Sequence, residues 1–220
     1  CGMLIFQPDF GQACIVFFGW AVMYFVAGAP MALLLALAGL AVAIGVVAYG
    51  HSEHFARRID GFLYPDFDPT SQLGYATNAI REGGILGVGV GEGQVKWSLP
   101  DAHTDFIIAV AAEEFGLIMV LIIIALYMSI VVRTLLRLMR ERDPFIRLAG
   151  TGLACIFGIQ AFINLGVAVR LLPAKGMTLP FVSYGGSSLI AGGIAVGMLL
   201  AFTRTRAQGE IGDLLRARVR

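Results

Sequence analysis

Charged residues are scarce in this sequence. Asp, Glu, Lys and Arg make up 14% of the 220 residues, against about 25% in an ordinary soluble domain, whereas 58% are hydrophobic. A soluble fold of this length could not bury so much apolar surface, which excludes a cytosolic enzyme, and a disordered segment would be far more polar. The net charge of +1 provides no basic surface for nucleic acid. The composition therefore indicates an integral membrane protein.

Cysteine is equally scarce. The three cysteines, Cys1, Cys14 and Cys155, are too few for a disulfide scaffold and lack the spacing of a metal site. Cys14 and Cys155 lie in apolar runs, so we expect them to be small buried side chains. The chain opens with Cys1 inside an apolar stretch and without the basic start of a signal peptide. We therefore expect a piece of a longer protein.

Long uncharged runs predict membrane-spanning helices. A helix crosses the hydrocarbon core of a bilayer, about 30 Å thick, with about 20 residues. Residues 10–50 contain no charge and are twice that long, so the turn-like Gly28-Ala29-Pro30 is expected to divide them into two spans. We predict an all-α, polytopic helical bundle with five spans, at about 11–28, 31–50, 106–132, 148–169 and 177–203.

The distribution of arginine predicts which side of the membrane each segment faces. The loop 133–147 and the tail 204–220 each contain five arginines against two acidic residues. The positive-inside rule makes both of them cytoplasmic, and the two spans between them are consistent with this. The outer loop 51–105, with four basic and eight acidic residues, and the short link 170–175 then face the opposite side.

The outer loop is long enough to contain structure of its own. Residues 54–63 place apolar side chains on one helical face, which predicts an amphipathic helix at the membrane interface, and residues 73–80 predict a second short helix. Glycine then occupies nearly every second position from Gly83 to Gly93. Glu92 breaks the G-x-G-x-x-G pattern of dinucleotide sites, so this run predicts close backbone packing or a re-entrant stretch buried by neighbouring protein.

Charged residues around the end of the outer loop are the candidate catalytic and binding residues. Asp105 stands where the third predicted span begins, either as a helix N-cap, a role that Thr104 could also fill, or as a general base at the rim of the bundle. Glu113 and Glu114 lie two turns into that span, where ionisable groups usually face the protein interior, and we assign them a structural or gating role. Basic residues on the outer side either bind an anionic headgroup or extend from helix ends to water: Arg81, Arg170 and Lys175.

Three segments carry a resemblance to a known family. Residues 100–107 (PDAHTDFI) with 111–116 (AAEEFG), and residues 172–188 (LPAKGMTLPFVSYGGSS), resemble the two main signatures of the SEDS proteins, and residues 7–11 (QPDFG) are similar to a third. The motifs are long, stand in the family order and cover most of the chain. Within the family, residues 91–96 and 173–180 favour the branch that acts in cell division over the branch that acts in elongation.

The resemblance implies a peptidoglycan glycosyltransferase of the bacterial inner membrane. Such an enzyme polymerises lipid II, a disaccharide-pentapeptide on undecaprenyl pyrophosphate, into glycan strands on the periplasmic face during cell division. Residues 1–220 would then be the C-terminal part of one integral membrane domain, because SEDS proteins have more spans than the five predicted here. The expected partners are a class B penicillin-binding protein, which is a transpeptidase, and other divisome proteins.

The same resemblance assigns roles to residues. The carboxylate of the His-Thr-Asp triplet is essential in SEDS proteins, which implies that Asp105 is catalytic. The negative charge of the leaving pyrophosphate must be stabilised by cations. These could be basic side chains alone or basic side chains together with a divalent metal ion. The substrate-binding candidates are Arg57, Arg58, Lys96, His103, Thr104, Lys175 and Ser183. Two other functions stay open, a lipid II flippase and a non-catalytic scaffold for the penicillin-binding protein.

The predicted orientation can be tested with single cysteines in the full-length protein. A cysteine at Ser71, in the outer loop, is expected to react with an impermeant thiol reagent in cells stripped of their outer membrane. A cysteine at Arg140, in the arginine-rich loop, is expected to stay unlabelled until the cells are lysed. Equal labelling of the two positions in intact cells would contradict the orientation.

Overall fold

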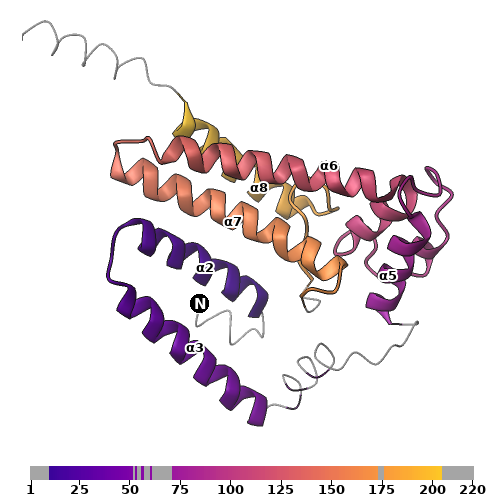
Figure 1. Cartoon of the computed structure of the whole chain (residues 1–220), viewed down its shortest axis with the longest axis horizontal. Coiled ribbons are helices and arrows are strands. Elements are labelled where there is room, and N and C mark those ends of the chain that lie inside the picture. The colour runs from indigo at the N-terminus through magenta and orange to yellow at the C-terminus, as the bar shows by residue number, and fades with distance from the viewer. Residues whose placement is uncertain are drawn as a thin grey trace, which may run out of the picture.

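The part of the chain that the structure describes is helical. The computed structural model describes residues 10–51, 53, 56, 60, 71–172 and 176–204, and these contain no strand. The helices, shown in Figure 1, are α2 (Phe10–Val26), α3 (Met31–His51), α5 (Gln72–Gly83), the 3-10 helix η1 (Val95–Trp97), α6 (Ile107–Leu138), α7 (Pro144–Ala168) and α8 (Gly186–Thr203). The short helix predicted at 73–80 is confirmed as α5. The amphipathic helix predicted at 54–63 falls largely outside the described residues.

Four of these helices, α3, α6, α7 and α8, are long and apolar enough to cross a membrane, and α2 is a shorter apolar helix. The chain is thus a polytopic helical membrane protein, as its composition predicted, whereas the count of five spans stays a prediction. The turn between α2 and α3 lies where the sequence placed it, with Gly28 at a φ of 74°.

Three of the predicted span limits lie four or more residues from the ends of the helices: the start of α7, which is Pro144 and not residue 148, and the two that follow. α8 begins at Gly186 and not near residue 177, because residues 176–185 form an irregular segment whose carbonyl groups bond to side chains of other helices. At the other limit, α6 continues to Leu138, six residues past the predicted end at 132. The residues that follow Val132 are mostly Arg, Leu and Met, which are good helix formers and extend the helix beyond the uncharged run.

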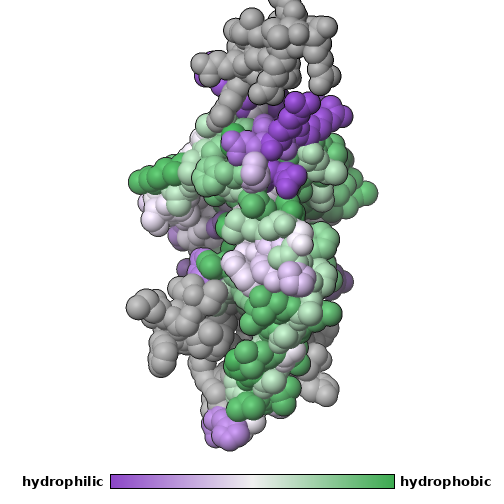
Figure 2. All heavy atoms as spheres, turned by 90° about the vertical axis from the view of Figure 1, so that its left-hand side faces the viewer, coloured by the Kyte–Doolittle hydropathy of each residue, from purple (hydrophilic) through white to green (hydrophobic). Residues whose placement is uncertain are grey.

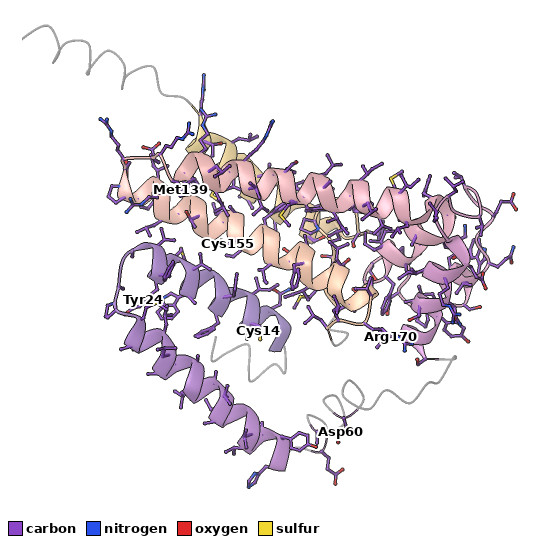
Figure 3. All side chains as sticks on the ribbon, in the orientation of Figure 1. Cys14, Tyr24, Asp60, Met139, Cys155 and Arg170 are labelled. Carbon is purple, nitrogen blue, oxygen red and sulfur yellow. The ribbon has the colours of Figure 1, made fainter. Side chains whose placement is uncertain are left out.

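The two ends of the α6–α7 pair differ in character. One end carries exposed arginines of α6, the α6–α7 loop and the end of α8: Arg133, Arg137, Arg140, Arg142 and Arg204. Figure 2 looks onto this end and shows a hydrophilic cluster on an otherwise largely hydrophobic surface. The opposite end, where Arg170 lies in Figure 3, carries α5 and the last part of the outer loop. This separation is the one that the predicted orientation requires, and the assignment of the two sides stays a prediction.

α7 is the central helix of the described bundle, since α2, α6 and α8 all pack against it. The contact with α2 is close because Gly152 has no side chain: a Cβ atom there would lie 2.5 Å from the Met23 sulfur. α3 lies apart from α6 and α7 in Figure 1 and has no buried residue. An apolar helix of this kind requires lipid or further protein around it.

The expectation of two buried cysteines is wrong for Cys14. Its side chain is exposed on α2, whereas Cys155 is half-buried in α7. An apolar run in a membrane protein marks a helix whose outer face contacts lipid, so an apolar neighbourhood in the sequence does not imply burial within the protein.

α6 is interrupted at Gly116, which has φ 79° and ψ −177° in the middle of the helix. The run of glycines that follows α5, here called the glycine loop (residues 83–91), fills this break. Leu117 and Ile118 donate their N–H groups to the carbonyls of Gly84 and Ile85, at 3.0 and 3.4 Å. In return, the N–H groups of the glycine loop at 88 and 89 donate to the carbonyls of residues 113 and 114, at 2.9 and 3.1 Å.

Glycine is required where the two backbones meet. A Cβ atom at Gly83 would lie 1.9 Å from the Ala112 carbonyl oxygen, and one at Gly116 would lie 2.3 Å from that of Ile85. Both distances are far shorter than any real contact of a Cβ atom. Of the two readings of the glycine run, close backbone packing is therefore confirmed.

A small apolar core holds the outer elements against the start of α6 and the end of α7. It consists of Ala76, Ala79, Leu99, Phe106, Ala109 and Val167. Two polar contacts position α5 beside it. The Ser71 hydroxyl caps the helix by accepting the N–H of Gly74 at 3.0 Å, and Arg170 donates from Nε to the Leu73 carbonyl at 3.3 Å. Arg170 is thus a structural contact in this fold.

Candidate functional site

The two signature segments of the sequence meet at the end of the bundle that carries α5. The first segment (residues 99–106) precedes α6, and the second segment (residues 176–185) precedes α8. The backbone N–H of Tyr184 donates to the His103 carbonyl at 2.9 Å. The Ser183 hydroxyl donates to the Thr104 carbonyl at 2.5 Å and accepts the N–H of Leu179 at 2.8 Å. Residues about 80 positions apart in the chain thus form one unit.

Asp101 shapes the first segment. It has a φ of 55°, a left-handed conformation that Asp and Asn adopt more readily than most residues. Its carbonyl accepts the N–H groups of Thr104, Asp105 and Phe106, at 3.1, 3.1 and 3.4 Å, and the Thr104 hydroxyl at 3.1 Å. This tight turn fixes the backbone up to the first residue of α6.

The alternative role of Asp105 as a helix cap is wrong. The N-cap residue of α6 is Phe106, and no side chain caps the helix. The Thr104 hydroxyl is turned back toward Asp101. Among the residues that the structure describes, the Asp105 carboxylate makes no hydrogen bond and no ion pair.

The surroundings of Asp105 alter its acidity. The carboxyl is half-buried, and a Cβ atom at Gly176 of the second segment would lie 3.4 Å from Oδ2. Burial raises the pKa of the Asp105 carboxyl above its ordinary value of 3.8, and the negative charge of Asp101 raises this pKa further. A carboxylate with a raised pKa, placed beside a glycine backbone, is a suitable proton acceptor.

Asn164 of α7 joins the two segments through hydrogen bonds to a carbonyl of each. Its side chain is 1% exposed, and its Nδ2 donates to the Asp105 carbonyl at 3.0 Å and to the Met177 carbonyl at 2.6 Å. One turn earlier on α7, Gln160 donates from Nε2 to the Thr178 carbonyl at 3.2 Å. The Tyr127 hydroxyl of α6 donates to the Pro180 carbonyl. Three side chains from the bundle thus satisfy the backbone of the second segment.

None of these three side chains is among the site residues predicted from the sequence. A signal was present for two of them, because Gln160 and Asn164 are the only amides in the apolar run of α7 and stand at i and i+4, on one helical face. Polar side chains inside a predicted span usually face the protein interior. Tyr127 gave no such signal, since a tyrosine in an apolar helix is common.

Glu113 and Glu114 bind the residues that precede the first segment. Glu113 is completely buried and accepts the N–H groups of Val95 and Lys96, at 2.8 and 3.0 Å, at the start of η1. Glu114 forms an ion pair with the Lys96 side chain, and the two side chains are only 13% and 15% exposed. The Lys96 ammonium also lies 5.4 Å from the centre of the Trp97 ring. Both glutamates therefore connect α6 to the outer loop.

The other predicted site residues fall into two groups. His103 is exposed, with its ring edge-on to Tyr184 at 5.8 Å between ring centres, while Thr104 is half-buried and Ser183 is buried. Their roles as substrate contacts stay predictions, as does that of Lys96. Three further candidates, Arg57, Arg58 and Lys175, lie outside the described residues.

The residues that the structure describes do not form a metal site. Within residues 10–51, 71–172 and 176–204, no group of three His, Cys, Asp or Glu side chains comes together that could hold an ion. Asp101 and Asp105 lie near one another but have no third ligand of these types. These side chains do not fit a divalent cation held by protein ligands, and we derive no step through one.

Comparison with known proteins gives consistent matches over almost the whole chain. The model of the cell cycle protein family of FtsW, RodA and SpoVE matches residues 1–208. The chain is 44% identical over 215 residues to the probable peptidoglycan glycosyltransferase FtsW of Caulobacter vibrioides, covering 96% of this chain and 55% of that protein. It is 40% identical over 203 residues to the same-named protein of Trichlorobacter lovleyi, covering 90% and 53%. The chain spans about half the length of the curated relatives it matches.

Two solved structures share the fold. One, described as "Structural coordination of polymerization and crosslinking by a peptidoglycan synthase complex", matches with a TM-score of 0.71 and 33% identity, covering 94% of this chain and 59% of that one. The other is a variant of the rod shape determining protein RodA of Thermus thermophilus, with a TM-score of 0.60 and 30% identity, covering 93% and 54%.

The bridging role of Asn164 can be tested by thermal unfolding of the purified full-length protein. Asn164→Ala leaves two backbone carbonyls without their donor, at about 1–3 kcal/mol for each buried unpaired group. The melting temperature should therefore fall by several degrees. Gln160→Ala, which removes one longer bond from a half-buried side chain, should lower it less. Equal melting temperatures for Asn164→Ala and the wild type would show that the bridge does not stabilise the site.

Proposed function

Because the chain belongs to the cell cycle protein family of FtsW, RodA and SpoVE, we propose that the whole protein polymerises lipid II into glycan strands and that Asp105 is its general base. Family membership agrees with the resemblance to SEDS proteins that the signatures gave. The observation that carries the assignment of Asp105 is its carboxylate, half-buried at the junction of both signature segments and not used as a helix cap.

The level of Asp105 relative to the membrane suits this substrate. The uncharged stretch of α6 lies between Glu114 and Arg133 and is about 27 Å long, close to the thickness of the hydrocarbon core. Asp105 precedes Glu114 by roughly 10–15 Å of chain, which puts it near the outer limit of the headgroup layer. A disaccharide attached to a membrane-bound pyrophosphate occupies the same level.

The proposed reaction needs one proton acceptor and one departing pyrophosphate. Asp105 takes the proton from the 4-hydroxyl of the acceptor GlcNAc, and that oxygen attacks C1 of the donor MurNAc. The bond from C1 to the pyrophosphate oxygen breaks, the anomeric centre inverts, and undecaprenyl pyrophosphate leaves with the bonding electron pair. The raised pKa of Asp105 brings the base closer to the working pH, which makes proton transfer more favourable.

Cationic side chains are needed beside the leaving group. Arg57, Arg58 and Lys175 are our candidates, on the basis of their place in the sequence. Lys96 is a weaker candidate than its position suggested, because its ammonium is already paired with Glu114. The ion pair would have to open, in a half-buried environment, before Lys96 could bind a pyrophosphate.

The setting of the reaction follows from the same relatives. We propose a multi-pass protein of the bacterial inner membrane that acts in cell division, with its C-terminus in the cytoplasm and Asp105 facing the periplasm. The relatives named FtsW support the division role, and the arginine distribution supports the orientation. The structural neighbour from a peptidoglycan synthase complex supports a penicillin-binding protein as partner, and other divisome proteins follow from the division role.

The test of this function is Asp105→Asn in the full-length protein, assayed with purified lipid II and the partner synthase. The amide keeps the size of the side chain but cannot accept the proton, so strand formation should fall by roughly 10²–10⁴-fold. Asp101→Asn is the matched control, because it removes a nearby carboxylate and keeps a residue type that tolerates the left-handed turn. A rate for Asp105→Asn within a fewfold of the wild type would contradict the assignment of the base. Failure of the wild type to form strands would instead favour a flippase or a scaffold.

The pH dependence gives a separate test of the environment of Asp105. A general base must be ionised, so the rate should fall on acidification through the pKa of Asp105, at a higher pH than for an ordinary aspartate. Asp101→Asn removes a negative charge that raises this pKa, so the acidic limb of log(kcat/KM) should move to lower pH. An unchanged or upward-shifted limb would show that Asp101 does not act on Asp105.

A further inference from the structure

The backbone on both sides of the Asp105 α-carbon is held by hydrogen bonds to groups outside α6. The N–H of Asp105 donates to the Asp101 carbonyl at 3.1 Å. The carbonyl of Thr104, in the same peptide group as that N–H, accepts the Ser183 hydroxyl at 2.5 Å. The carbonyl of Asp105 itself accepts Nδ2 of Asn164 at 3.0 Å. Both peptide groups that meet at Asp105 are therefore fixed, and with them the direction in which its side chain leaves the backbone.

The Ser183 hydroxyl is fully used in this arrangement. The residue is 9% exposed, and its hydroxyl accepts the N–H of Leu179 at 2.8 Å while it donates to the Thr104 carbonyl. A hydroxyl has a single proton to donate, so a hydrogen bond from Ser183 to a substrate would have to replace the bond to Thr104. The sequence predicts Ser183 as a substrate contact, whereas its hydrogen bonds indicate a role in holding the peptide group before Asp105.

Asn164 holds the peptide group after Asp105. Both N–H donors of its amide are used, one by the Asp105 carbonyl and one by the Met177 carbonyl of the second segment at 2.6 Å. Its Oδ1 has no hydrogen-bond partner in the part of the chain that the structure describes, so the contribution of this side chain lies in its donors. Met177 follows Gly176, where a Cβ atom would lie 3.4 Å from Oδ2 of Asp105. The same amide therefore keeps the second segment beside the carboxylate.

The Asp105 carboxylate has no restraint of its own within the described residues, where it makes no hydrogen bond and no ion pair. A general base must lie within hydrogen-bond reach of the proton that it removes. A misplacement of about 1 Å can lower a rate by about 10²-fold. The orientation of this carboxylate therefore depends on the backbone that carries it.

We propose that Ser183 and Asn164 are positioning residues, which orient the Asp105 carboxylate by holding the carbonyls of Thr104 and Asp105. This inference rests on the proposed function, because it takes Asp105 to be the general base. Neither side chain contacts the substrate, and each acts on the rate through Asp105. Loss of either bond leaves substrate binding in place and reduces the fraction of bound complexes in which the carboxylate reaches the acceptor hydroxyl.

The test is a double-mutant cycle in the full-length protein, assayed with purified lipid II and the partner synthase. Ser183→Ala removes the hydroxyl and should lower kcat by about 10- to 100-fold while KM stays the same. Ser183→Thr keeps a hydroxyl and should restore most of kcat. Ser129→Ala is the matched control, because it removes a hydroxyl of α6 that bonds to the Leu126 carbonyl, and its kcat should equal that of the wild type.

The decisive measurement is Ser183→Ala in the Asp105→Asn background. If Ser183 acts through the base, this second change should lower the residual rate by about twofold or less. An equal fold loss in both backgrounds would overturn the proposal, because Ser183 would then act on the fold or directly on the substrate. A raised KM with an unchanged kcat would also overturn it, because Ser183 would then be a substrate contact.

The two failures can be told apart. Asp105→Asn alone decides whether Asp105 is the general base, whereas the comparison of the two backgrounds decides whether Ser183 acts through that residue. Asn164→Ala, taken through the same cycle, tests the second bond and repeats the measurement if Ser183→Ala does not assemble. Its loss of kcat should likewise be much smaller in the Asp105→Asn background than in the wild type.

Discussion

The site depends on one buried amide in α7. The Asn164 side chain is buried, and its single NH₂ group donates to the carbonyls of Asp105 and Met177. Each of these carbonyls belongs to a segment that is neither helix nor strand, so neither has a partner of its own within regular structure. The amide thus sets the distance between the two segments, and with it the placement of Gly176 beside the Asp105 carboxylate.

The same requirement explains the rest of the architecture. A membrane protein can contain irregular backbone only where neighbouring groups satisfy it, since an unpaired peptide group in an apolar medium costs several kcal/mol. The second signature segment obtains its partners from Asn164, Gln160 and Tyr127, and the first obtains them from the Asp101 turn. The glycine loop obtains hydrogen-bond partners from α6, which is interrupted at Gly116 where these bonds form. In each of these three segments, part of the irregular backbone is thus paired with a neighbouring helix or turn.

The sequence predicted the helical class, the α2–α3 turn and α5, because uncharged runs and glycine–proline punctuation are local signals. It also drew attention to Asp105 and to the glycine run. It failed where long-range pairing decides the structure: α8 begins at Gly186 because the apolar residues before it bond across the bundle, and no local pattern reveals such bonds. Likewise, Lys96 and Glu114 pair across 18 positions of the chain, whereas the sequence suggested a substrate contact for Lys96 and a structural or gating role for Glu114.

The interruption of α6 affects how this end of the protein unfolds locally. In an ordinary helix the turns can fray one after another from the end, each losing only its own bonds. In α6, the turns before Gly116 cannot separate from those after it without breaking the hydrogen bonds of both to the glycine loop. The end of α5 is part of the same contact, because Gly83 packs against Ala112. Opening of this end of the bundle therefore breaks the contacts of α6, the glycine loop and α5 together. Small thermal movements of any one of these segments are thereby restrained, and Asp105, which directly precedes Phe106 at the start of α6, is held at the same end of the bundle.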